Sequence, residues 1–354
     1  MKTPGYLPPP IHTEDLATIV ARVGGALVVK ANGMRVDYAL PREASAELFE
    51  FLRPNAMAEI GSTFIARLPG GRIFGSGNVL SPDGKSIARD VSPDFGKPFN
   101  EHWLLSYGKM PPPVTVAGRT AVIATTLGNG YGHWLLEELP RLIALETDGC
   151  ETLIAHAGAS CQREAIALKS FSGNLINARR RDHYSCDELI VPSLGELTPE
   201  TVALLNDFVT PLRDEDRTPS FGERIYISRT GAKRRHVTNE PRLWCALESR
   251  GFIKLHLEEL TWTEQITAFH SAKVIIAPHG AGLANLVFCR PGTKIVELFH
   301  RSYVNPCYWQ LASLQALDYR PLVSAGTEPL AQLLVANRLN ITAEIAQVLA
   351  ALDR

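Results

Sequence analysis

The stretch from residue 273 to residue 299, KVIIAPHGAGLANLVFCRPGTKIVELF, places a histidine and two glycines directly after an apolar run. Gly280 and Gly282 let the backbone approach a ligand closely, and the N–H groups of a following helix favour an anion, most simply a diphosphate. His279 can donate to a phosphate oxygen or stand near a reacting centre. The alternative is a tight strand-to-helix turn with a structural histidine.

This stretch departs from a dinucleotide-binding fingerprint. The third glycine is missing, and no acidic residue stands at the expected end of a second strand. A dinucleotide-dependent oxidoreductase or epimerase is therefore a disfavoured alternative function. A non-catalytic protein that binds nucleotide sugars or glycans is a second alternative.

Basic residues follow another apolar run, in the segment SRTGAKRRHV (228–237). Arg229 directly follows a predicted strand, and Lys233, Arg234 and Arg235 could reach phosphates from the same loop. For Arg234 and Arg235, a solvated surface charge is an equal alternative. Glu297 lies late in a further predicted strand, where a carboxylate suits the hydroxyls of a ribose. An outward-facing strand residue is the alternative for Glu297.

A glycine-rich loop also precedes a predicted helix in the segment GNGYGHWLLEELPRL (128–142). His133, Glu137 and Arg141 recur at i, i+4 and i+8, so they are expected to share one helix face. Either His133 or Glu137 could act as a general base. The alternative is an ordinary amphipathic helix with an intrahelical ion pair. The pattern H-x-x-x-E lacks the second histidine of H-E-x-x-H and so predicts no zinc site.

The chain also contains one D-x-D triplet, Asp214-Glu215-Asp216. Such a triplet can hold Mg²⁺ or Mn²⁺ on a sugar nucleotide. Here it lies between two arginines and two prolines, and no predicted strand positions it. We interpret it as solvated charge in a linker.

The elements that must position these residues alternate between strand and helix, which indicates βαβ units and parallel sheets. Residues 1 to about 115 predict a β-rich lead-in. The first half then predicts strands at 120–125, 152–157 and 188–192 and helices at 131–146, 161–171 and 198–212. The charged segment 213–222 predicts a domain boundary. After it come strands at 223–229 and within 252–257 and 273–277, and helices at 239–251, 261–272 and 281–289. Asn239 is predicted to cap the first of these helices, and the capping box Thr261-x-x-Glu264 is predicted to open the second.

The predicted fold is therefore α/β, with two Rossmann-like domains that face a cleft. We predict an N-terminal domain over residues 1–217, a C-terminal domain over 218–327 and a terminal helical segment over 328–354. Ligands of such sheets bind outside the carboxyl ends of the strands.

The bulk composition excludes several classes of protein. The 354 residues carry a net charge of −1, so no global field attracts nucleic acid or an anionic membrane. No apolar stretch approaches the roughly 18 residues of a membrane span, and the N-terminus lacks a signal-peptide core. The six cysteines are scattered, which favours buried thiols in a reducing compartment.

The three motif-bearing segments resemble glycosyltransferase family 61 in their order and spacing. They read YGHWLLEELPRL, IYISRTGAKRR and IIAPHGAGLANLVFCRPGTKIVELF, and the resemblance covers roughly residues 60–325. The family includes bacterial capsular-polysaccharide enzymes, plant xylosyl- and arabinosyltransferases, and animal N-acetylglucosaminyltransferases. Its members are inverting enzymes of the two-Rossmann GT-B architecture that need no bound metal.

The resemblance implies that residues 1–217 form an acceptor-binding domain and residues 218–327 a nucleotide-sugar-binding domain, with donor, catalytic and acceptor groups. The donor-binding residues are expected to be Arg229, Lys233, Arg234, His279, Gly280, Ala281, Gly282, Leu283, Asn285 and Glu297. The catalytic base is expected to be His133 or Glu137, with Trp134, Glu138 and Arg141 on the acceptor side.

The implied function is transfer of a sugar from a nucleotide-sugar co-substrate, UDP-sugars being one candidate, to a hydroxyl of a glycan or lipid-linked acceptor. No metal or other cofactor is expected. The setting suggested is bacterial surface polysaccharide synthesis in the cytoplasm, at the inner face of the membrane, with at most peripheral membrane contact. The donor sugar, the acceptor and the oligomeric state stay open.

Overall fold

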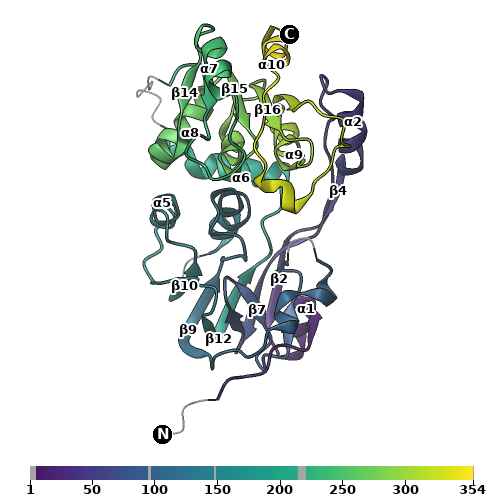
Figure 1. Ribbon diagram of the computed structural model, residues 1–354. Coiled ribbons are helices and arrows are strands. Elements are labelled where there is room, and N and C mark those ends of the chain that lie inside the picture. Colours follow the sequence, from purple (N-terminus) through teal and green to yellow (C-terminus); the bar gives the residue numbers. More distant parts are fainter. Residues whose placement is uncertain (1–4, 95–96, 147–148, 214–220, 354) are drawn as a thin grey trace. The chain divides into compact units, whose positions relative to one another are not determined.

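The computed structural model describes residues 5–94, 97–146, 149–213 and 221–353, which form two compact α/β units (Figure 1). Unit 1 comprises Met1–Met34 and Ile60–Glu196, and unit 2 comprises Arg35–Glu59 and Leu197–Arg354. The Asp214–Asp216 triplet and most of the predicted linker lie outside the described residues. Within the described part of the chain, every helix is too short or too polar to cross a bilayer.

Unit 1 is built on one mixed sheet in the order β1-β8-β7-β6-β12-β9-β10-β11, with β5 pairing β12 and β2 pairing β5. Its strands are β1 (His12–Glu14), β2 (Ala26–Ala31), β5 (Thr63–Pro69), β6 (Arg72–Phe74), β7 (Asn78–Leu80), β8 (Ser86–Ala88), β9 (Val114–Val122), β10 (Thr152–Ala155), β11 (Asn174–Asn177) and β12 (His183–Pro192). Its helices are α1 (Leu16–Arg22), α3 (Tyr131–His133), the π-turn η4 (Trp134–Glu138), α4 (Leu139–Ala144) and α5 (Ser160–Leu168), with 3₁₀ turns η2 (Phe99–Glu101) and η3 (Trp103–Ser106).

The four last strands of unit 1 form a Rossmann-like parallel core. They lie in the order β11-β10-β9-β12, which is 3-2-1-4 in order of their appearance. Strand β11 was not predicted, so the strand expected as the third of this half is its fourth. The switch point of the sheet lies between β9 and β12, and ligands of such sheets bind at the carboxyl ends there.

The β-rich lead-in predicted before residue 115 is confirmed, and its strands outside segment 35–59 extend this same sheet. Strands β5 and β6 run antiparallel to β12, which pairs with β9 along its other edge. The core beneath them gathers apolar side chains from the lead-in and from the Rossmann-like strands, for example Leu68, Val122 and Ile154. One continuous core therefore holds both parts.

Unit 2 contains a parallel five-stranded sheet in the order β14-β13-β15-β16-β17. Its strands are β13 (Arg224–Ile227), β14 (Ile253–Leu255), β15 (Val274–Pro278), β16 (Lys294–Phe299) and β17 (Asp318–Val323), while β3 (Met34–Asp37) and β4 (Met57–Ile60) form a separate ribbon. Its helices are α2 (Ala46–Leu52), α6 (Pro199–Val209), α7 (Glu240–Glu248), α8 (Trp262–Ser271), α9 (Cys307–Leu314) and α10 (Ile345–Asp353). The 3₁₀ segments are η1 (Arg53–Asn55), η5 (Thr210–Leu212), η6 (Leu257–Glu259), η7 (Ala281–Phe288) and η8 (Leu334–Arg338).

The order of these strands is 2-1-3-4-5, a doubly wound arrangement whose switch point lies between β13 and β15. The loops after these two strands carry the basic run and the histidine–glycine turn. The capping box predicted for α8 is confirmed, because Glu264 N–H donates to Thr261 Oγ1 over 3.2 Å and Thr261 N–H donates to Glu264 Oε2 over 2.8 Å. Asn239 precedes α7 but does not cap it, since its side chain bonds the backbone of Ala343.

The compact units divide the chain differently from the predicted domains. Helix α6 belongs to unit 2, where Asn206 donates to the carbonyl of Val287, so the units part near residue 196 rather than 217. Segment 35–59 also joins unit 2, where Trp309 donates to the carbonyl of Ala39 over 2.8 Å. The terminal segment predicted at 328–354 packs its helix α10 into the core of this unit.

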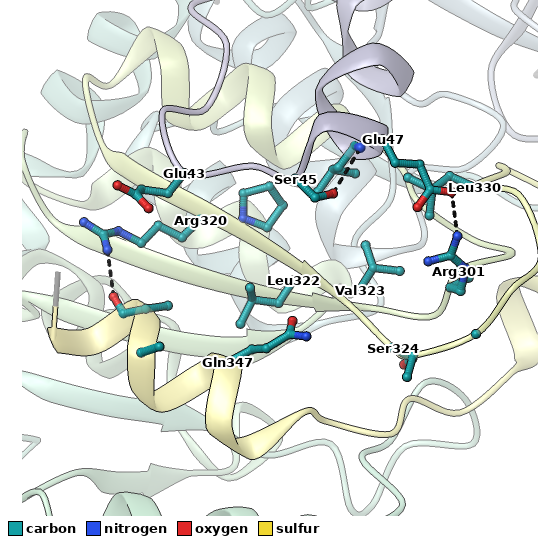
Figure 2. Close-up of a pocket in the computed structure, with 16 residues that line it drawn as sticks. Glu43, Ser45, Glu47, Arg301, Arg320, Leu322, Val323, Ser324, Leu330 and Gln347 are labelled. Carbon is teal, nitrogen blue, oxygen red and sulfur yellow. Dashed lines mark hydrogen bonds and ion pairs between the residues drawn. The ribbon is translucent and has the colours of Figure 1, made fainter.

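A cavity of about 560 Å³ lies along the free edge of β17, between α2 and α10 (Figure 2). Its two arginines are already engaged. Arg320 binds the carboxylate of Asp318 and the carbonyl of Ala351, and Arg301 binds Glu47 and the carbonyl of Glu328. The cavity therefore offers no uncompensated cation to an anionic ligand.

The helix of residues 131–144 in unit 1 is interrupted by the π-turn at 134–138, whose i→i+5 bonding shifts the phase of the helix. The shift breaks the single face predicted for His133, Glu137 and Arg141. His133 and Glu137 stay partly exposed, at 41% and 24% of their side chains, whereas Arg141 is buried. Glu138, which was expected on the acceptor side, is buried with Arg141.

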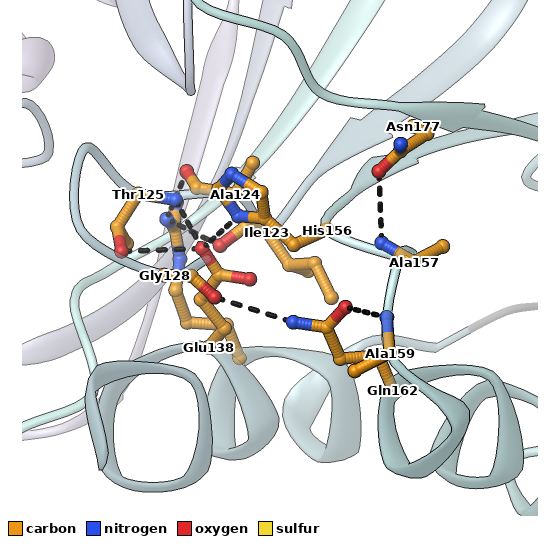
Figure 3. A network of polar contacts seen from close by, with 11 residues as sticks. Ile123, Ala124, Thr125, Gly128, Glu138, His156, Ala157, Ala159, Gln162 and Asn177 are labelled. Carbon is orange, nitrogen blue, oxygen red and sulfur yellow. Dashed lines mark hydrogen bonds and ion pairs between the residues drawn. The ribbon is translucent and has the colours of Figure 1, made fainter. Parts of the chain in front are cut away.

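Glu138 and Arg141 connect this helix to the ends of the parallel strands, and Figure 3 shows Glu138 next to Thr125 and His156. Glu138 Oε1 accepts hydrogen bonds from Thr125 N–H after β9, over 2.5 Å, and from His156 Nδ1 after β10, over 2.8 Å. Arg141 donates to the carbonyls of Ile123 and Ala124 and, through its other terminal nitrogen, to that of Pro192 at the end of β12. The two side chains thus hold the switch point of unit 1.

Burial perturbs the electrostatics of this anchor. Complete desolvation lowers the pKa of Arg141 to about 10, and the negative charges of Glu138 and Glu137 oppose that shift. Gly128 makes room for the buried carboxylate, because a Cβ atom at this position would stand 1.6 Å from Glu138 Oε1. The anchor therefore requires the glycine-rich loop as well as the charged pair.

We expect Arg141→Met to lower the free energy of unfolding by about 3–5 kcal/mol, because it leaves buried carbonyls unpaired and Glu138 without its counter-charge. Urea unfolding followed by circular dichroism measures this change. The matched control is Arg163→Met, which also removes hydrogen bonds to two carbonyls, but from an exposed position. It should cost less than about 1 kcal/mol. Equal losses in both variants would contradict the assigned role.

Candidate active site

The basic and glycine-bearing loops of unit 2 come together at the switch point between β13 and β15. Arg229 follows β13, and its guanidinium fills the space next to Gly280, where a Cβ atom would stand 2.1 Å from Arg229 Nη1. Arg235 donates from Nε to the carbonyl of His279 over 3.0 Å and from Nη1 to that of Asn337 over 2.9 Å. The sequence predicted Arg229, His279 and Gly280 as neighbours, and the structure brings them together.

Arg229 and Arg235 form a pair of like charges. Partial burial and the positive charge of Arg235 lower the pKa of Arg229, so each guanidinium disfavours the other. Among the described residues, neither arginine forms an ion pair with a carboxylate, and Arg229 Nε is buried without a hydrogen-bond partner. An anion bound here would relieve both the charge repulsion and the unmet hydrogen bond.

Arg235 is the strongest addition to the predicted donor residues. Its backbone has φ +56°, a left-handed conformation that is uncommon for a residue with a side chain. The guanidinium also lies 5.5 Å from the ring centroid of Tyr303. The adjacent basic run was the sequence signal, but a surface charge was an equal interpretation there. Only the contacts of Arg235 with His279 and Asn337 distinguish a residue of the site from a surface charge.

The glycines act differently from the prediction. Gly280 makes room for Arg229, and Gly282 makes room for Leu257, whose Cδ1 would lie 2.5 Å from an added Cβ. Gly280 has an extended backbone with φ 171°, so it is needed for space rather than for a left-handed turn. The following segment is the 3₁₀ helix η7 rather than an α-helix. Glycine therefore brings a cationic side chain to the turn.

Glu297 does not have the geometry expected of a ribose-binding carboxylate. It is fully buried, and each oxygen already accepts one hydrogen bond, from His279 Nδ1 and from the Tyr319 hydroxyl, both over 2.5 Å. Its burial follows from its place on β16, an interior strand of the sheet, with β15 on one side and β17 on the other.

The remaining predicted donor residues divide by exposure. Leu283 and Asn285 are buried, and the Asn285 amide donates to Gln265 Oε1 over 3.0 Å. Their burial gives them a packing role within unit 2. Ala281, Lys233 and Arg234 are exposed; Arg234 donates to Asn337 Oδ1 over 3.3 Å, and its carbonyl accepts from Arg229.

In unit 1, the two predicted catalytic side chains form a contact. His133 Nδ1 lies 2.6 Å from Glu137 Oε1, and both side chains are partly exposed. The carbonyl of Glu137 packs against Gly195 after β12, where an added Cβ would stand 2.6 Å from this oxygen. A partly exposed histidine–carboxylate pair next to a switch point can accept a proton from a bound hydroxyl group.

The three residues expected on the acceptor side are buried. Trp134 is 2% exposed, Arg141 1% and Glu138 0%. Glu138 and Arg141 carry the anchor described above, so we correct their predicted location. Their burial follows from the phase shift at the π-turn, which no sequence period announces. His156 was missed, although a histidine directly after a buried strand was a usable signal.

Among the described residues, no three histidine, cysteine or acidic side chains gather into a group that could hold a metal ion. All six cysteines are free thiols. The triplet Asp214–Asp216 is not part of this observation, because it lies outside the described residues.

Comparisons with known proteins found similar sequences. The sequence pattern of the family described as Glycosyltransferase 61 matches residues 131–296, a segment that includes His133, Glu137, Arg229 and His279. A beta-1,2-xylosyltransferase, RCN11, of Oryza sativa subsp. japonica is 34% identical over 64 residues, which are 18% of this chain and 12% of the relative.

Two further relatives show similar partial matches. The EGF domain-specific O-linked N-acetylglucosamine transferase of Drosophila melanogaster is 35% identical over 98 residues, 27% of this chain and 18% of its own. A beta-1,2-xylosyltransferase of Arabidopsis thaliana is 31% identical over 97 residues, 25% of this chain and 18% of its own. The chain thus spans less than a fifth of the length of these relatives. The resemblance to glycosyltransferase family 61 that the motifs indicated is confirmed for the region from Tyr131 to Val296.

Proposed function

We propose that the chain is a glycosyltransferase that moves a sugar from a nucleotide-sugar donor, held by unit 2, to a hydroxyl of a glycan or lipid-linked acceptor. One observation carries the proposal. Arg229 and Arg235 lie together at the switch point of a doubly wound sheet, and neither pairs with a carboxylate among the described residues. This is the arrangement that a nucleotide diphosphate needs.

The chemistry follows from where charge develops. As the acceptor oxygen bonds to the anomeric carbon, the bond from that carbon to the diphosphate breaks, and negative charge grows on the departing phosphate. Arg229 and Arg235 stabilise that charge from fixed positions, without reorganisation during the reaction. His279 lies at the same switch point, where its backbone carbonyl accepts a hydrogen bond from Arg235.

The acceptor hydroxyl must lose its proton as it attacks. The proposal assigns this step to the His133–Glu137 pair of unit 1. Either His133 takes the proton and Glu137 stabilises the imidazolium, or Glu137 takes the proton itself. A single displacement inverts the configuration at the anomeric carbon, which is the outcome we propose.

The finer features of the proposal come from the family resemblance. The two Rossmann-like sheets match what the GT-B architecture requires of each half, and transfer without a bound metal fits a site in which arginines supply the positive charge. Relatives named as beta-1,2-xylosyltransferases and as an O-linked N-acetylglucosamine transferase support sugar transfer as the reaction. Bacterial surface polysaccharide synthesis in the cytoplasm, at the inner face of the membrane, remains our proposed setting.

Nucleotide binding tests the arginine pair. We expect a panel of UDP, GDP, dTDP and CMP in a thermal-shift assay to reveal one that raises the melting temperature. Arg229→Gln and Gly280→Ala should then weaken its binding by about 10- to 100-fold in calorimetry, because one removes the guanidinium and the other displaces it. Arg250→Gln, which removes an exposed charge from the same unit, is the control. Unchanged affinity in both test variants would exclude the assigned donor site.

Turnover tests the proposed base. Glu137→Gln and His133→Gln should reduce kcat by about 10²–10⁴ for the residue that accepts the proton, with nucleotide affinity preserved. Glu164→Gln removes an exposed carboxylate from α5 and should leave kcat unchanged. Rates are measured as sugar transfer and as donor hydrolysis against a panel of sugar nucleotides. A chain that binds donor but neither transfers nor hydrolyses it would be a binding protein instead.

Chelation tests metal independence. Activity should persist in EDTA, because the arginines take the place of a cation at the diphosphate. A different result would assign the donor diphosphate to the D-x-D triplet: EDTA removes the activity, Mn²⁺ restores it, and Asp214→Asn or Asp216→Asn abolishes it.

A further inference from the structure

A chain of three buried polar side chains ends at the histidine of the donor turn. The Tyr319 hydroxyl donates to Glu297 Oε2 over 2.5 Å, and Glu297 Oε1 lies 2.5 Å from His279 Nδ1. Their exposed fractions are 6%, 0% and 5% in the order Tyr319, Glu297, His279. All three lie within the sheet of unit 2, on or directly after the adjacent strands β17, β16 and β15.

The strand register explains how these side chains meet. Glu297 pairs with Pro321 across β16 and β17, and Tyr319 is two residues earlier on its strand. Residues two apart on a strand face the same side, so Tyr319 lies diagonally next to Glu297 on one face of the sheet. His279 directly follows β15, and its own N–H donates to the carbonyl of Leu298 over 2.9 Å.

The hydrogen bonds determine which nitrogen of His279 carries a proton. An ionised carboxylate only accepts hydrogen bonds, so Nδ1 must donate to Glu297. Tyr319 fills the other oxygen of the same carboxylate. Burial and then the negative charge of Glu297 raise the pKa of Tyr319 well above its usual value, so its hydroxyl stays protonated and remains a donor.

Aromatic rings fix the plane of the imidazole. Its centroid lies 5.2 Å from that of Phe299 in a stacked geometry, 5.5 Å from Tyr303 and 5.3 Å from Tyr308. The backbone carbonyl of His279 is held by Arg235. Within the described residues, no hydrogen bond engages Nε2 of His279. This nitrogen is therefore the one left for a ligand.

We propose that Tyr319 and Glu297 are positioning residues, which hold His279 with a proton on Nδ1 and so present the lone pair of Nε2 to a hydroxyl group of the nucleotide-sugar donor. The identity of the ligand rests on the proposed function, whereas the orientation of the ring does not. Glu297 thus acts on the donor through His279. Tyr319 acts one step further away, from a strand that none of the sequence motifs reaches.

Histidine tautomers test the proposal directly. In two-dimensional ¹H–¹⁵N spectra of the ligand-free protein, with the resonances of His279 identified by their loss in His279→Asn, we expect the proton on Nδ1. Glu297→Gln should shift this population toward Nε2–H, because its amide offers a donor to Nδ1. Tyr319→Phe should shift it the same way, because the carboxylate that the hydroxyl no longer holds can turn away from Nδ1. A wild-type ring protonated only on Nε2 would overturn the proposal before any variant is made.

The matched control is Tyr226→Phe. Tyr226 lies on β13 of the same sheet, and its buried hydroxyl has no hydrogen-bond partner, so its removal should leave the His279 tautomer unchanged. Circular dichroism verifies that each variant is folded. If Tyr319→Phe does not fold, the wild-type tautomer and Glu297→Gln still decide the question. A shift in Tyr226→Phe equal to that in Tyr319→Phe would reduce the effect to general loosening of the sheet.

Affinity for the nucleotide found in the thermal-shift panel gives the second readout. Tyr319→Phe should raise its Kd by about tenfold, the size of one hydrogen bond, and Tyr226→Phe should not. If no nucleotide binds the wild-type chain but the tautomer responds as expected, the proposed function fails and the positioning role stands. If nucleotide binds equally well to wild type and Tyr319→Phe and the tautomer does not respond, the positioning role fails alone.

Discussion

Two guanidinium groups packed at the ends of β13 and β15 without a neutralising carboxylate set the electrostatics of unit 2. Charges of the same sign disfavour each other at close range, and partial burial removes the water that would screen them. The fold holds Arg229 in the space left by Gly280 and Arg235 by two backbone carbonyls. Such an arrangement costs stability, because neither positive charge is neutralised by a carboxylate among the described residues.

Two buried carboxylates of the chain, unlike the two arginines, have hydrogen-bond partners that compensate for their burial. Glu138 and Glu297 are both fully buried, and each binds a histidine that directly follows a parallel strand, His156 in unit 1 and His279 in unit 2. A buried charge is tolerated when hydrogen bonds replace its water shell. The two units therefore use one device for different purposes: in unit 1 it anchors a helix to strand ends, and in unit 2 it orients a ring beside the arginine pair.

The contrast between Glu137 and Glu138 shows how a helical turn assigns roles. Both are carboxylates, and they follow His133 by four and five residues. The π-turn directs Glu138 to the strand ends and leaves Glu137 partly exposed beside His133. π-turns are rare and occur often at functional sites, where the extra residue re-aims side chains. Here it separates a structural carboxylate from one that can exchange protons with a ligand.

Much of the architecture could be predicted from the sequence, because local patterns encode it. Apolar runs bounded by glycine and proline predicted the strands that carry the site, and the Thr261–Glu264 capping box predicted the start of α8. The order of the loops predicted that Arg229, His279 and Gly280 meet, since the carboxyl ends of neighbouring parallel strands lie at one edge of the sheet. The membership of α6 and of segment 35–59 in unit 2 was not predicted, because it depends on contacts distant in sequence.

The sequence by itself determined which residues stand after the strands, because hydrophobic periodicity and turn residues act over a few positions. Only the tertiary structure decided which of them are buried, bonded or free. The sequence predicts Glu297 as a ribose ligand, but in the structure the hydroxyl of Tyr319, 22 residues away, donates to its second oxygen. From the sequence, Arg235 could equally be a surface charge, but in the structure it donates hydrogen bonds to the carbonyls of His279 and Asn337. Burial and hydrogen-bond pairing arise between strands, and no local pattern records them.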